Sequence, residues 1–136
     1  MRLASVILTI VALATVARAD LVKQYTGRIV ISPDPPPTIA SELAAYVKAN
    51  ATKDDAYEAI KGSPWEIHFV GFLSANATAV TLEIGDDKLP VGAKQRLVIS
   101  TVKLTTAAGF EANKTYVVRL VAGKRILAKA TLRLRD

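Results

Sequence analysis

From Trp65 onward, apolar residues recur at every second position in short segments, and this alternation limits most strongly how the chain can fold. A period of two places neighbouring side chains on opposite faces of a strand, so each segment predicts one β-strand. Turn-forming residues separate the segments, for example between Gly85 and Lys88. We predict strands at residues 65–73, 80–84, 97–104, 116–120 and 126–134, with the last two joined as a hairpin around Gly123. In the segment 97–104 the apolar residues change from odd to even positions, which predicts a β-bulge near Ser100 and Thr101.

The segment before these strands predicts one more strand and two helices. Residues 21–31 alternate imperfectly, as an edge strand does, and a proline-rich run from Pro33 to Pro37 ends them. Apolar residues then recur at helical spacing over residues 38–50, with Thr38 as the N-cap. A shorter helix is expected at residues 52–62, between Thr52 as its cap and Gly62 as its terminator. Because the two helices have no other apolar partner, we expect them to pack on or beside one sheet.

The first nineteen residues have the pattern of a secretory signal peptide. A positive start at Arg2 precedes apolar and small residues from Leu3 to Val16, and Ala17-Arg18-Ala19 follows as a small-x-small cleavage site. The alternative is an uncleaved membrane anchor, but this run is shorter than the roughly 20 apolar residues that span a bilayer. We therefore expect cleavage after Ala19, a mature domain at residues 20–136 without a transmembrane segment, and a secreted or periplasmic location.

The absence of cysteine favours a bacterial source for such an exported chain, because small secreted eukaryotic domains usually depend on disulfides. Each asparagine begins an Asn-x-Thr triplet, at Asn50, Asn76 and Asn113. In a eukaryotic secretory protein these would be glycan acceptors. In a bacterial protein they are helix-end and turn residues, which is the interpretation we favour.

A local motif before the predicted hairpin sharpens the fold prediction. Phe110 lies six positions before Tyr116, which opens the strand Tyr116-Val117-Val118-Arg119-Leu120. This arrangement resembles the corner between strands E and F of fibronectin type III and related immunoglobulin-like domains, where the tyrosine hydroxyl bonds back to nearby backbone. The resemblance covers residues 65–135, although Ala112 replaces the proline usual at that corner. It implies a mainly β fold: an antiparallel immunoglobulin-like or fibronectin III-like sandwich, here with a helical insertion at about residues 38–61.

The inventory of reactive side chains excludes several kinds of chemistry. With no cysteine and only one histidine, the chain has no disulfides, no zinc-thiolate site and no multi-histidine metal site. We expect no metal ion and no cofactor. His68 shares a strand face with Glu66, and this pair leaves open a small hydrolase or isomerase. The alternative is a half-exposed strand histidine without a catalytic role. We favour that alternative and predict that the protein is not an enzyme.

Charge is distributed unevenly along the mature chain. Residues 20–87 contain five Lys/Arg and ten Asp/Glu, whereas residues 88–136 contain eleven and two. Five cations on or beside the last hairpin share odd positions and would form one stripe, which comprises Arg119, Arg125, Lys129, Arg133 and Arg135. Such a stripe would attract a protein, an anionic glycan or a lipid head group. The alternative is a solubilising face that protects an edge strand. Nucleic acid fits poorly, because no aromatic residues are interleaved with the cations.

A second candidate surface lies on the first strong strand. Val70 and Phe72 are apolar on a face that begins with polar residues, so they are protein-contact candidates unless the helices cover them. Together these patterns predict an exported, non-catalytic binding or structural module of the bacterial periplasm or cell surface. The alternative is an inhibitor or accessory subunit that adds its edge strand, residues 21–31, to a partner's sheet.

Overall fold

Strands dominate the computed structural model, which describes residues 5–8, 15–52, 56–58 and 64–135. In chain order, its elements are β1 (Ser5–Leu8), α1 (Thr15–Tyr25), β2 (Ile29–Ser32), α2 (Ala40–Asn50), β3 (Ala56–Glu58), β4 (Trp65–Phe72), β5 (Ala79–Ile84), β6 (Asp87–Gly92), β7 (Leu97–Leu104), β8 (Thr115–Ala122) and β9 (Arg125–Arg133). The mainly β prediction is confirmed. So are the strands expected from residue 65 onward, within a residue or two at their ends.

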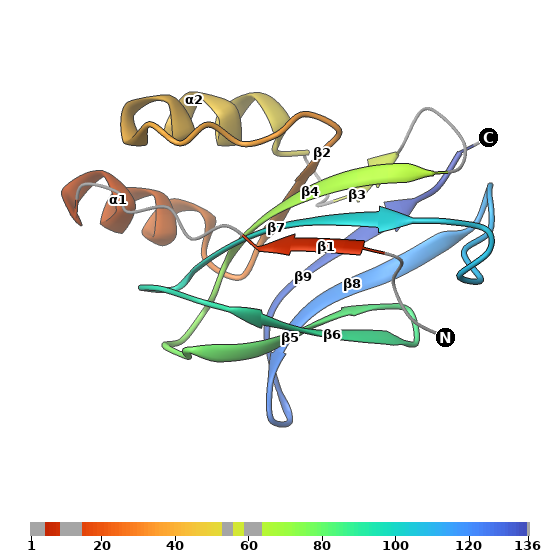
Figure 1. Cartoon of the computed structure of the whole chain (residues 1–136). Coiled ribbons are helices and arrows are strands. Elements are labelled where there is room, and N and C mark those ends of the chain that lie inside the picture. The colour runs from red at the N-terminus through yellow and green to blue at the C-terminus, as the bar shows by residue number, and fades with distance from the viewer. Residues whose placement is uncertain (1–4, 9–14, 53–55, 59–63, 136) are drawn as a thin grey trace.

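The strands form two sheets. Sheet A has the order β1-β7-β4-β2 and sheet B has the order β3-β9-β8-β5-β6. Neighbouring strands in both sheets are antiparallel, apart from the parallel pair β3 and β9. In Figure 1 the two helices lie above sheet A and sheet B lies below it, so the elements form three layers.

The inner faces of the sheets enclose the larger core. Alternate residues of β4 and β8, among them Trp65, Phe69 and Leu120, are buried in it. Gly71 brings the sheets close together, because a methyl group at this position would collide with the side chain of Leu120. The indole Nε1 of Trp65 donates a hydrogen bond to the carbonyl of Arg135 (2.9 Å) and so holds the end of the chain to sheet A.

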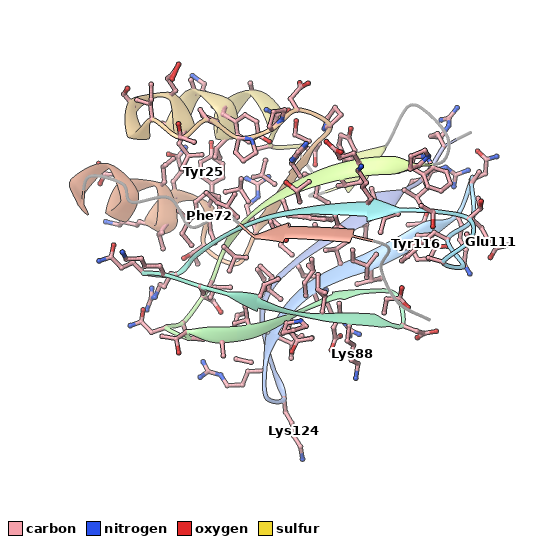
Figure 2. The ribbon with its side chains drawn as sticks, viewed as in Figure 1. Tyr25, Phe72, Lys88, Glu111, Tyr116 and Lys124 are labelled. Atoms are coloured by element: carbon pink, nitrogen blue, oxygen red, sulfur yellow. The ribbon has the colours of Figure 1, made fainter. Side chains whose placement is uncertain are left out.

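A second core lies between sheet A and the helices. Val70 and Phe72 on β4 pack with residues of α1 and α2, including Tyr25, Leu43 and Val47. Figure 2 shows Tyr25 and Phe72 between the helix layer and the sheet, and their ring centroids are 5.6 Å apart. The helices therefore cover the face of sheet A, as the pattern of β4 predicted.

The predicted strand at residues 21–31 is wrong over its first half, because α1 extends to Tyr25. Leu21, Val22 and Tyr25 lie one and four positions apart, which places all three on one side of a helix, and all three are buried in the second core. Only Ile29–Ser32 forms a strand, β2, at one end of sheet A.

Several other expectations for the first half need correction. The N-cap of α2 is Ile39 rather than Thr38, and no side chain caps it. The helix predicted at residues 52–62 is wrong at Ala56–Glu58, where β3 instead pairs with the available edge of β9. The other residues of that prediction, apart from Thr52, lie outside the described part of the chain. The Thr52 carbonyl accepts a hydrogen bond from Arg28 Nη2 (2.6 Å).

The bulge expected near Ser100 and Thr101 is also wrong. β7 pairs with β4 in one register along its whole length. Its phase change has another cause: Leu97 and Ile99 face the helix layer, whereas Val98, Val102 and Leu104 face the core between the sheets. Both faces of β7 are buried from Leu97 to Ser100, whereas farther along only the face toward sheet B is buried, so the apolar residues change from odd to even positions.

Candidate functional site: the outer face of sheet B

The outer face of sheet B is the sheet face that the helices leave open. Strand register places one residue from each of four strands in a row across it, in the order Lys88, Glu83, Arg119 and Lys129. A neighbouring row contains Pro90, Thr81, Val121 and Ile126. Lys88 and Lys129 are exposed, as is Arg133 farther along β9. We call Lys88, Arg119, Lys129 and Arg133 the basic face.

Three of the five cations predicted as a stripe lie on this face. Register pairs Arg119 with Lys129 and Thr115 with Arg133, so the two strands present these side chains on one side. Arg135 follows the end of β9. Arg125 is separated from the others by a register shift, so the expectation of one uninterrupted stripe is corrected.

The register shift is a β-bulge on the last hairpin. Leu120 pairs with Ala128 and Val121 pairs with Ile126, which leaves Leu127 as the extra residue. Leu127 is buried and its carbonyl accepts a hydrogen bond from Ser74 N–H (2.9 Å). Beyond the bulge the alternation is reversed, so Ile126 is exposed although its position would have been buried in a regular strand.

Arg119 is the cation of the basic face that is held most firmly. Its Nη2 lies 2.8 Å from Oε1 of Glu83, whose side chain is only 13% exposed. Its Nε is buried without a hydrogen-bond partner. Because Glu83 balances this charge, the exposed side chains of Lys88 and Lys129 contribute most to the positive charge of the rows described above.

Lys88, Lys124 and Ile126 were not predicted from the sequence as site residues. Figure 2 shows Lys88 and Lys124 extending on the side of the molecule opposite the helices, Lys124 from the tip of the β8–β9 hairpin. For Lys88, a signal was present in the sequence: Leu89 and Val91 recur at every second position just after the turn at Gly85, which indicates a strand with Lys88 on its opposite face. For Ile126 it was the adjacent pair Ile126-Leu127, which cannot both be buried on one face of a strand.

The protein-contact candidates Val70 and Phe72 do not lie on a surface in this structure. Both are fully buried beneath α1 and α2. Their apolar character on a partly polar strand face is explained by the helix layer, which covers only part of sheet A.

His68 lies at the polar end of the same strand face. Its Nδ1 is 2.7 Å from Thr101 Oγ1, and its Nε2 is 3.5 Å from Glu66 Oε1. Burial lowers the pKa of His68 from its ordinary value of 6.5, and the Glu66 carboxylate opposes this shift. The pair foreseen in the sequence is therefore brought together, but only 6% of the imidazole side chain is exposed. A catalytic base must reach its substrate, so this geometry favours a structural role.

The corner before β8 forms the contact expected of it. The backbone N–H of Glu111 donates a hydrogen bond to the Tyr116 hydroxyl (2.9 Å), and Phe110 packs edge-on against the Tyr116 ring. Figure 2 shows Glu111 and Tyr116 together at this end of the molecule. A pocket of about 380 Å³ opens beside the corner, and Asp86, Lys114 and Arg119 are among its lining residues. His68 and Glu66 do not line it.

Within the described ranges, no group of three or more His, Cys, Asp or Glu side chains could hold a metal ion. Among these same residues, no helix has the length and apolar character needed to cross a membrane. No protein-family model, curated protein or solved structure matches the chain.

Proposed function

We propose that the protein is an exported, non-catalytic binding module that contacts an anionic partner through the basic face of sheet B. One observation carries this proposal: strand register gathers cations from β6, β8 and β9 on the outer face of sheet B, which in the described part of the chain packs against neither the helices nor sheet A. A surface of one dominant sign attracts and orients an oppositely charged partner.

Export rests on the signal pattern of residues 1–19. In the structure, α1 continues across the predicted cleavage site after Ala19, and β1 pairs with β7. Cleavage would remove β1 and shorten α1. It would keep Leu21, Val22 and Tyr25, the residues of α1 that pack in the second core. These three core residues of α1 therefore all lie after the predicted cleavage site.

The proposed relation to immunoglobulin-like domains is supported by the corner at Tyr116. The Tyr116 hydroxyl accepts a hydrogen bond from nearby backbone, as the resemblance implies, and Phe110 packs against the Tyr116 ring. These domains are often recognition modules, which agrees with a binding role.

The proposal is tested by salt-gradient elution from a dextran sulfate column. The full chain is produced for this purpose in a bacterial host that secretes it. Lys88→Ser/Lys129→Ser removes two exposed charges from the basic face and should elute at clearly lower salt than the wild type. Lys23→Ser/Lys48→Ser removes two exposed charges from the helices and should elute close to the wild type. Equal shifts for the two double variants would mean that net charge alone governs retention and would contradict a located binding face.

A further inference from the structure

The tip of the β8–β9 hairpin combines an exposed aliphatic side chain with cations. Ile126 is 51% exposed and follows Lys124 and Arg125, which are exposed as well. Pairing of β5 with β8 stops at Thr81 and Val121, so the turn from Ala122 to Arg125 lies beyond the part of β8 that pairs with β5. Figure 1 shows this tip extending past β5 and β6.

The fold holds Ile126 in its exposed position. Leu127 occupies the core in its place, and the backbone at the bulge and just after it is hydrogen-bonded to neighbouring loops. Ser74 N–H donates to the Leu127 carbonyl (2.9 Å), and Lys129 N–H donates to the Gly27 carbonyl (3.1 Å). Ile126 therefore cannot turn inward without breaking the register that buries Leu127.

The apolar surface continues inward from the tip. Ile126 is paired with Val121 across the hairpin, and the same row continues through Thr81 to Pro90 on the edge strand β6. The parallel row contains Lys88 and Lys129. This arrangement places aliphatic carbon at a projecting tip and positive charge around it and behind it.

From this arrangement we infer that the hairpin tip binds the surface of a bilayer that contains acidic lipids, and this inference rests on the proposed anionic partner. Ile126 enters the boundary between head groups and acyl chains, while Lys124 and Arg125 contact lipid phosphates. Amphipathic segments bind such surfaces by these two contributions, apolar insertion and attraction of cations to acidic lipids. A soluble polyanion would use the cations alone and would leave Ile126 in water.

The test is co-sedimentation of the secreted protein with vesicles of equimolar phosphatidylglycerol and phosphatidylcholine. Ile126→Ser should weaken vesicle binding about tenfold, because it removes an aliphatic side chain that inserts only partly into the bilayer. Ile39→Ser is the matched control, because Ile39 is 57% exposed at the start of α2, and it should bind as the wild type does. The vesicle affinity of Lys124→Ser/Arg125→Ser should fall about thirtyfold, whereas that of Lys23→Ser/Lys48→Ser should change little.

A parallel dextran sulfate column separates the two proposals. Ile126→Ser should keep wild-type retention on the column while its vesicle binding falls, a combination that charge recognition alone does not produce. Column retention without vesicle binding by the wild type would overturn the lipid inference and leave the proposed function standing. If Ile126→Ser bound vesicles as tightly as the wild type, the lipid inference would also be overturned and the proposed function would stand. If the wild-type protein bound neither the column nor the vesicles, both proposals would be overturned.

Discussion

At the scale of single residues, Gly71 shows how closely the sheets approach. A Cβ atom there would collide with Leu120 from the opposite sheet. We expect Gly71→Ala to destabilise the protein by about 1–3 kcal/mol, because overpacking forces side chains or backbone to move. Leu120→Ala should cost about 2–5 kcal/mol by leaving a cavity.

The double variant tests whether this contact is the cause. With Leu120 truncated, the added methyl group has room, so Gly71→Ala should be neutral or stabilising in that background. Urea unfolding of the four proteins gives the coupling free energy. Additive effects would mean that the cost of Gly71→Ala comes from elsewhere on β4.

His68 provides the residue-scale test of pH dependence. Its folded-state pKa lies below 6.5, so the unfolded chain binds more protons between these two pKa values. The contribution of neutral His68 to stability is therefore complete above pH 6.5 and is lost as the pH falls toward the folded-state pKa. His68 is the only histidine, so the protein with His68→Asn should lose less stability than the wild type over that range.

Two measurements decide this point. Urea unfolding at a series of pH values compares the two proteins, and NMR titration of the single imidazole gives its pKa directly. Parallel pH profiles for wild type and variant, or an imidazole pKa at or above 6.5, would show that burial does not govern His68. Glu66 and Lys103 lie on the same face, so the titration is repeated at high salt to measure their contribution.

At the scale of elements, the sequence predicted strands well where one face is polar. On β5, Val80, Leu82 and Ile84 are buried in strict alternation with partly or fully exposed residues, and the predicted strand matches. On β7, which has covered residues on both faces, the strand was predicted at its observed bounds but a bulge was wrongly expected within it. The unbroken β7 was assigned a bulge because its apolar residues serve two cores, and no local pattern distinguishes these cases.

Long-range pairing explains the other differences. Residues of β3 carry helix-like signals, yet the edge of β9 offers backbone partners that outweigh a weak local preference. In α1, Leu21 and Tyr25 fit an imperfect strand and a helix equally well, and the apolar face of sheet A decides between them.

The candidate site was predictable in its charges but not in its geometry. Arg119, Lys129 and Arg133 follow from alternation within the hairpin. Lys88 joins them only through the pairing of β6 with β5 and of β5 with β8, and Arg125 leaves them only because Leu127 is an extra residue. Both facts depend on contacts between segments far apart in the chain.

At the scale of the whole molecule, the two sheets differ in how many of their faces are covered. Sheet A is covered on both faces across much of its width, by the helices on one side and by sheet B on the other. Sheet B is covered on one face, so the other is available to a partner. Because strands β4 and β7 supply side chains to both cores, loss of either core should weaken the other.

This shared sheet predicts cooperative unfolding. Trp65, the single tryptophan, reports the core between the sheets, and far-ultraviolet circular dichroism reports the helix layer. Leu43→Ala in the helix core and Leu132→Ala in the inter-sheet core should each cost about 2–5 kcal/mol. In both variants the fluorescence and dichroism midpoints in urea should fall together. If Leu43→Ala lowers the dichroism midpoint while Trp65 fluorescence keeps that of the wild type, the helices form an independent layer, and the covered face of β4 and β7 does not couple the two cores.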